Sequence, residues 1–253
     1  MQRLAFGCGP IPTGRKGYFE QHSALEVSEA YADLIAGDTL HAWRKEAGRE
    51  FVMILTANRF LTLDPFDENG VGPLAHPASE HGFLRPTEAN RELWKAVDAQ
   101  ARALHANYVL IRTPASFTPS RENIKNIGVF RKDVIGTVPY KICWEARGMW
   151  DDEELQEIAD ANEMILARDP YVEFEFGEPP SGDVIYTLRH PRGRRNFDRD
   201  DVQDLLDFFG EHEGNVVAIF RGGERKRNAF AFGVEMRRNA GEDVGYFDSD
   251  DED

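Results

Sequence analysis

The sequence has no apolar run long enough to span a bilayer. Its first residues, Met1 to Phe6, lack the long apolar core of a secretory signal peptide. Cysteine is also scarce, because Cys8 and Cys143 are the two that the chain contains, and they lie far apart in strand-like segments. We therefore expect a soluble cytoplasmic protein with no membrane partner and with buried thiols rather than a disulfide.

Positive charge is in short supply. Lysine and arginine number 30 against 45 aspartates and glutamates, which gives a formal net charge of −15. Such a surface, taken as a whole, opposes non-specific binding to DNA. Much of the acidic excess lies in residues 241–253, which we expect to form a disordered tail after a folded domain at residues 1–240.

Common motifs for metals and nucleotides are absent as well. The chain has no His-Glu-x-x-His pattern and no pair of cysteines spaced as zinc ligands. Gly7-Cys-Gly9 is too short to be a nucleotide-binding glycine loop. The cofactor therefore stays open, with a divalent metal held by carboxylates among the alternatives.

What the sequence does contain is a regular succession of strand-like and helix-like segments. Short apolar or alternating stretches predict strands at residues 3–9, 24–28, 51–57, 108–113, 140–147, 164–169, 183–190 and 215–221. Apolar stripes predict helices at residues 38–47, 88–105, 120–134, 151–163, 198–211 and 227–238, the first capped by Asp38. Strands joined mostly by helices, in a chain of 253 residues, predict an α/β fold: a single-domain (β/α)8 barrel of the TIM type.

One connection of this barrel is unusually long. Residues 58–88 carry four prolines and several glycines between the third strand and the next helix. A loop of this length inside a compact domain is uncommon unless it has a function. The segment is therefore either a lid over the barrel or a surface insertion.

Short motifs spread over nearly the whole chain are similar to those of a known family. They are Phe6-Gly-Cys-Gly9, Gly14-Arg-Lys-Gly-Tyr-Phe19, Ser23-Ala-Leu-Glu26, Thr113-Pro-Ala-Ser-Phe-Thr-Pro119, Glu122-Asn123, Trp144-Glu-Ala-Arg147 and Asp169-Pro170. With these motifs the chain resembles domain-of-unknown-function family 72, also called YecE-like. The resemblance implies a TIM-type barrel and brings no established activity.

The chain departs from the family pattern at several strand ends. Thr56 stands where the family commonly has a lysine, Arg112 where it has a glutamine, and Arg221 where an asparagine pair begins. Leu188 opens a Leu-Arg-His-Pro stretch in place of Arg-Leu-His-Gly, and Asn228 replaces an aspartate. The resemblance therefore implies a divergent member whose chemistry has been altered or lost, although the acids Glu26, Glu145 and Asp169 are retained.

The predicted strand at residues 140–147 shows how polar groups reach the barrel mouth. Side chains alternate between the faces of a strand, so Cys143, Glu145 and Arg147 share one face. Strand C-termini gather at the mouth of a barrel, where barrel enzymes have their active sites. The candidate catalytic residues are accordingly Glu26, Glu145, Asp169 and His190. They could bind a metal or transfer protons, whereas the alternative for each is a salt bridge that closes the mouth.

Arginines gather at the same end. The segments 189–195 and 221–227 are basic and follow the last two strands, the position where barrels often bind phosphate. The candidate ligand-binding residues are Arg112, Arg147, Arg189, Arg192, Arg194, Arg195, Arg221 and Arg225. The alternative is that both loops are solvated and pair with acids of neighbouring helices.

These patterns leave three functions open. The first is an enzyme that hydrolyses or rearranges a phosphate-bearing small molecule, with the glutamates as acid, base or metal ligands. The second is a barrel that binds such an anion without chemistry. The third is a protein that binds nucleic acid, or a nucleic-acid end, through the basic loops, with the acidic tail competing for them.

Overall fold

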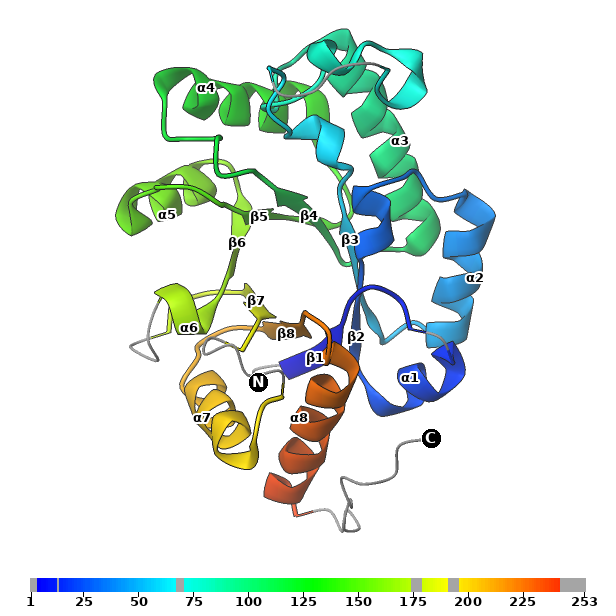
Figure 1. Ribbon diagram of the computed structural model, residues 1–253, viewed down its shortest axis with the longest axis vertical. Coiled ribbons are helices and arrows are strands. Elements are labelled where there is room, and N and C mark those ends of the chain that lie inside the picture. Colours follow the sequence, from blue (N-terminus) through cyan, green and yellow to red (C-terminus); the bar gives the residue numbers. More distant parts are fainter. Residues whose placement is uncertain (1–3, 13, 67–70, 174–178, 191–195, 242–253) are drawn as a thin grey trace.

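The computed structural model describes residues 4–12, 14–66, 71–173, 179–190 and 196–241. Eight strands pair in parallel in chain order, and β8 pairs with β1, so the sheet closes into a barrel surrounded by helices (Figure 1). The predicted (β/α)8 barrel is confirmed. The expected acidic tail lies outside the described residues, apart from Gly241.

The strands are short and of nearly equal length, in the order the sequence predicts. Their bounds are Leu4–Cys8 (β1), Ala24–Val27 (β2), Val52–Thr56 (β3), Tyr108–Arg112 (β4), Lys141–Glu145 (β5), Met164–Arg168 (β6), Val184–Leu188 (β7) and Val216–Phe220 (β8). The α-helices are Arg15–Gln21 (α1), Gly37–Ala47 (α2), Glu88–Leu104 (α3), Arg121–Val129 (α4), Asp152–Ala161 (α5), Pro170–Glu173 (α6), Arg199–Gly210 (α7) and Arg225–Asn239 (α8). In the part of the chain that the structure describes, no helix is long and apolar enough to cross a membrane.

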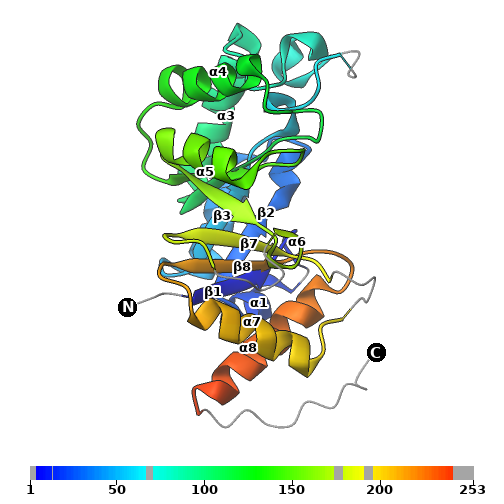
Figure 2. The same cartoon turned by 90° about the vertical axis from the view of Figure 1, so that its left-hand side faces the viewer.

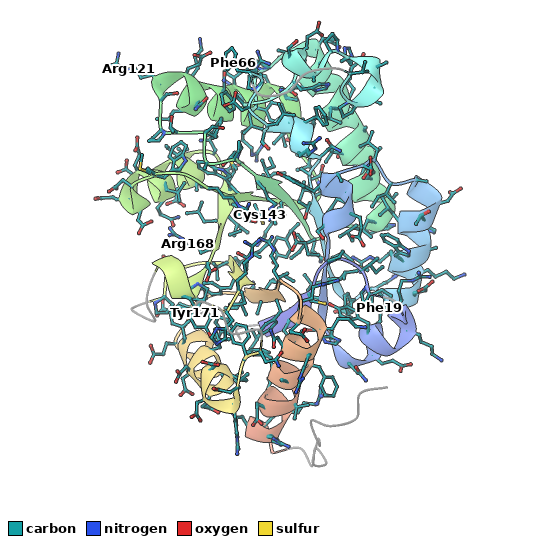
Figure 3. All side chains as sticks on the ribbon, in the orientation of Figure 1. Phe19, Phe66, Arg121, Cys143, Arg168 and Tyr171 are labelled. Atoms are coloured by element: carbon teal, nitrogen blue, oxygen red, sulfur yellow. The ribbon has the colours of Figure 1, made fainter. Side chains whose placement is uncertain are left out.

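The side chains of the strands form two separate cores. Inward-facing residues such as Ala24, Ile54 and Cys143 fill the barrel with small and aliphatic groups, and Cys143 lies near the centre of the ring (Figure 3). Outward-facing residues such as Trp144 and Tyr186 pack under the helices in a larger core rich in aromatic rings. The two-residue alternation of each strand produces this division, and it agrees with the faces expected for β5.

Four of the helices begin where the sequence supplies a side-chain hydrogen-bond acceptor. The side chains of Thr87, Ser120 and Asp151 accept from backbone N–H groups in the first turns of α3, α4 and α5. Asp198 and Asp201 cap each other's backbone at the start of α7. α7 and α8 cover one end of the long axis of the molecule, and α3 and α4 cover the other (Figure 2).

Three local expectations needed correction. Asp38 is not an N-cap, because α2 begins at Gly37 and Ala36 occupies the capping position without a side-chain bond. α1 was not among the predicted helices, because the glycines and prolines of residues 10–17 are typical of a loop. The helix expected to end at residue 134 changes instead into a π-helical turn at Phe130–Ile135, which local propensity does not reveal.

The long β3–α3 connection is built onto the barrel. Leu61 and Leu84 are fully or almost fully buried, and Asn90 of α3 donates its side-chain amide to the carbonyl of Gly82 at 3.2 Å. Thr62 donates its hydroxyl to the backbone carbonyl of Arg112 at 2.7 Å, which joins the segment to the end of β4. Its role as a lid stays a prediction.

A buried arginine organises the end of the barrel opposite the mouth. The guanidinium of Arg44 in α2 donates to the carbonyls of Leu104, Phe51 and His105 at 2.8, 2.8 and 2.7 Å. It thereby joins the last turn of α3 to the entry of β3. Burial lowers the pKa of Arg44, because hydrogen bonds rather than a carboxylate offset the lost hydration.

We expect Arg44→Lys to lower the free energy of unfolding by about 2–4 kcal/mol, because an ammonium cannot satisfy all of these buried carbonyls at once. Urea unfolding followed by circular dichroism measures the change. Arg102→Lys is the matched control: Arg102 is exposed and pairs with Asp98 on the same helix, so we expect a change below about 0.5 kcal/mol. Equal losses in both variants would contradict the assigned role of Arg44.

Candidate functional site

The candidate site is the layer of polar side chains above the aliphatic interior of the barrel. Each of these side chains comes from the C-terminal end of a strand and points inward: Glu26 from β2, Thr56 from β3, Arg112 from β4, Glu145 from β5, and Arg221 immediately after β8. Gly9, after β1, makes room for this layer. A Cβ atom there would come within 2.9 Å of the Cβ of Glu26.

Arg221 occupies the middle of this layer. Its Nε and Nη2 atoms donate to the two carboxylate oxygens of Glu26, both at 2.9 Å. Its Nη1 donates to Oε2 of Glu145 at 2.8 Å. A single guanidinium therefore joins strands β2, β5 and β8, and Thr56 donates a further hydrogen bond to Glu26 at 2.8 Å.

Glu145 has more cationic partners than it has oxygens. Oε1 accepts from Nε and Nη2 of Arg147 at 3.2 and 3.1 Å. Oε2, already bonded to Arg221, also lies 3.1 Å from Nε of Arg112. That last contact is an ion pair without a hydrogen bond, because the N–H of Arg112 does not point at the carboxylate.

Burial and charge shift the proton affinities in opposite directions. Burial alone would raise the pKa of Glu145, but Arg221 and Arg112 outweigh it and hold the pKa below its ordinary value. Burial likewise opposes the charge of Arg221, yet Glu26 and Glu145 raise its pKa above the usual range. Burial lowers the pKa of Arg112, with only partial relief from Glu145. The pairing with Arg221 therefore favours the charged forms of both Glu145 and Arg221.

The charges in this layer do not balance. Two carboxylates, Glu26 and Glu145, face three guanidinium groups, those of Arg112, Arg147 and Arg221. Arg112 is the least satisfied of the three, since its side chain is 14% exposed and its guanidinium makes no hydrogen bond to any residue within the described part of the chain. It lies over the ring of Tyr31, 5.1 Å from the ring centre. Tyr31 is a neighbour that sequence patterns did not indicate.

Two of the acids and bases grouped from the sequence lie elsewhere. His190 is on the outer side of β7, where its Nε2 is 3.2 Å from Asp201 of α7 and its ring packs on Phe197. Asp169 accepts a hydrogen bond from the backbone N–H of Tyr171 at the start of α6. The structure therefore brings Glu26 and Glu145 together with three arginines but does not join Asp169 or His190 to them. The catalytic roles of all four stay predictions.

The remaining basic residues form a looser set. Arg189 is exposed at the end of β7, and Arg225 donates to the carbonyl of Gly222 at 3.1 Å as α8 begins. Arg192, Arg194 and Arg195 lie outside the described residues. Over the ranges that the structure describes, no group of three or more histidines, cysteines or acids could hold a metal ion. Among the acids of the mouth layer, Glu26 and Glu145 are already bonded to Arg221.

Comparisons with known proteins rest on structure. No family model matches the sequence, and no curated protein matches it. A DUF72 family protein from Enterococcus faecalis matches with a TM-score of 0.65, at 13% identity over 94% of this chain and 98% of that protein. One from Thermotoga maritima matches with a TM-score of 0.64, at 12% identity over 93% of this chain and 100% of that protein.

The chain has the DUF72 fold. A xylose isomerase domain protein from Planctomyces limnophilus is more distant, with a TM-score of 0.50 and 10% identity over 94% of this chain and 96% of that protein. At these identities the likeness concerns the barrel itself. The DUF72 fold leaves the chemistry of the mouth to the side chains described above.

We expect Arg221→Met to lower the free energy of unfolding by about 3–5 kcal/mol, because it leaves two buried carboxylates without their shared partner. Arg147→Met is the matched comparison. It removes a 44%-exposed partner of the same Glu145, and we expect a loss of at most about 1 kcal/mol. Chemical unfolding at pH 7 measures both, and a small loss in Arg221→Met would show that the central guanidinium is not the main support of the layer.

The stability that Glu145 contributes should depend on pH in a defined direction. Its folded pKa is depressed below the ordinary 4.5, so its contribution is complete above that pH and is lost as pH falls through the folded value. We expect the difference in unfolding free energy between the native protein and Glu145→Gln to narrow as pH falls below 4.5. Glu153→Gln, an exposed acid on α5, controls for the loss of one charge. A difference that stays constant down to acid pH would refute the expectation.

Proposed function

We propose that this protein binds a phosphate-bearing small molecule at the C-terminal mouth of its barrel. The observation that carries the proposal is the state of Arg112. Its guanidinium is largely buried, stands beside one already shared carboxylate, and donates no hydrogen bond within the described part of the chain. Nε of Arg112 is a buried donor without a hydrogen-bond partner. Such a donor is costly, and an anionic oxygen is the partner that satisfies it best.

The charge of the layer supports an anion rather than a cation. Three guanidinium groups face two carboxylates, so this layer carries one positive charge in excess, although the whole chain has a formal net charge of −15. A positive site within a negative surface attracts anions locally. An arginine fork also matches the paired oxygens of a phosphate.

The surroundings favour phosphate among anions. α8 begins at Arg225, after Gly222, Gly223 and Glu224, and its N-cap Glu224 makes no side-chain capping bond. Gly222 has a φ of 101°, a conformation that glycine adopts readily. Unpaired N–H groups at a helix start favour phosphate. Arg189 and Arg225 flank this rim, and the contribution predicted for Arg192, Arg194 and Arg195 belongs to the same proposal.

The same geometry favours binding over chemistry. Glu26 and Glu145 are bonded to Arg221, which leaves them poorly placed to accept or donate a proton. We infer that a divergent member of the DUF72 family has kept an anion site here while its acids serve as counter-ions. The shared motifs and the structural match over 94% of this chain support the family part of this inference, and the bonds of both glutamates to Arg221 support their role as counter-ions.

Titration calorimetry with inorganic phosphate tests the proposal, and phosphate monoesters then define the size of the ligand. We expect Arg112→Gln to weaken phosphate binding by at least about tenfold, because it removes a charged fork, and Arg112→Lys to weaken it less. Arg121→Gln, at the outer end of α4 (Figure 3), is the matched control and should bind like the native protein.

Two outcomes would count against the proposal. The first is phosphate binding by the native protein that Arg112→Gln leaves unchanged. The second is the absence of phosphate binding together with tight, salt-dependent binding of an unphosphorylated oligonucleotide, which would favour the nucleic-acid alternative.

A further inference from the structure

We infer that Glu145 is an internal competitor for the anion site, and that Arg147 is the arm that exchanges Glu145 for the bound phosphate. This inference rests on the proposed function and describes how that site is regulated. It gives Arg147, already a candidate ligand-binding residue, the specific role of changing partner from Glu145 to the phosphate.

The contact between Arg147 and Glu145 uses two guanidinium nitrogens on a single carboxylate oxygen, which is less than a full two-oxygen fork. Nε and Nη2 of Arg147 both approach the same oxygen, Oε1 of Glu145, at 3.2 and 3.1 Å. An arginine that holds a phosphate uses the same nitrogens. In the structure, the carboxylate therefore occupies the donors that an incoming anion needs.

Arg147 is the partner that Glu145 can lose at least cost. Its side chain is 44% exposed, whereas Arg221 is 7% exposed and Arg112 is 14% exposed. After Arg147 leaves, Oε2 of Glu145 still accepts from Arg221 at 2.8 Å and stays beside Arg112. The carboxylate is not stranded as an unpaired buried charge, which is the expensive outcome when a buried pair is broken.

The location of Arg147 suits an exchangeable arm. It lies two residues beyond the end of β5, just before Gly148, whose φ is 151°. Arg112, in contrast, lies in β4, and Arg221 directly follows β8. Each of these strands pairs with a neighbouring strand on both sides. The mouth thus combines a fixed pair of guanidinium groups with one that has room to move.

Phosphate affinities of four variants test the inference, measured by calorimetry with inorganic phosphate on the full chain. We expect Arg147→Gln to weaken binding by about tenfold, with the melting temperature within about 2 °C of native. Arg147→Lys should restore part of the affinity. Glu145→Gln should strengthen phosphate binding several-fold, because it removes the carboxylate that competes with phosphate. The gain should be similar to that from one added charged hydrogen bond.

The double variant separates an exchange from two independent effects. In Glu145→Gln/Arg147→Gln, the gain from removing Glu145 should vanish, because the freed arm is no longer present. If the Arg147–Glu145 pair were purely structural, both single variants would lose stability. Their phosphate affinities would then not change in opposite directions. Should Glu145→Gln fail to fold, the two Arg147 variants still decide the question.

The possible failures can be told apart. Phosphate binding that depends on Arg112 but is unchanged in Arg147→Gln would overturn the exchange and leave the proposed function standing. Weaker binding in a folded Glu145→Gln would overturn the competitor role. No phosphate binding by the native protein or by Glu145→Gln would overturn both the exchange and the proposed function.

Discussion

The guanidinium of Arg221 is the interaction on which the mouth of this barrel depends. It donates hydrogen bonds to Glu26 and Glu145 from a position immediately after β8, the last strand of the ring. Each carboxylate is buried, and removing the cationic partner of a buried carboxylate is strongly destabilising. The position of every other charged group in the layer follows from this arrangement, because Arg112 and Arg147 approach a carboxylate that already has a partner.

The closed ring explains how one residue can hold such a position. Arg221 is 195 residues from Glu26 in sequence, yet both lie at the same rim because β8 returns to β1. Across the barrel, Arg221 also meets β5. A structural neighbour with only 12% or 13% identity can therefore share the ring while its rim carries different charges.

The sequence predicted those features that depend on local periodicity. Strand alternation correctly placed Cys143 inside the barrel and Trp144 outside, and the succession of elements predicted the ring. The same alternation puts His190 on the outer face with Leu188. The prediction that His190 lies with the mouth residues did not take this alternation into account. Asp38 was wrongly predicted as the cap, because the capping position of α2 is Ala36, two residues earlier.

The pairing within the site was beyond local reasoning. The sequence indicated that arginines and glutamates would meet at one rim, but not that Arg221, rather than Arg112, would lie between the two glutamates. That choice depends on which strands face each other across the barrel. The stacking of Arg112 on Tyr31 depends in the same way on how the turn after β2 packs beside β4.

The aliphatic filling of the ring has a further consequence for the arginines above it. Ala24, Ile54, Cys143 and their neighbours form an aliphatic layer of low dielectric constant beneath the rim. This layer screens the charges of the arginines and glutamates only weakly. The electrostatic potential at such a mouth changes strongly when a single charge is gained or lost. Relatives with this barrel can therefore diverge through substitutions at the rim more than through changes in the ring of strands.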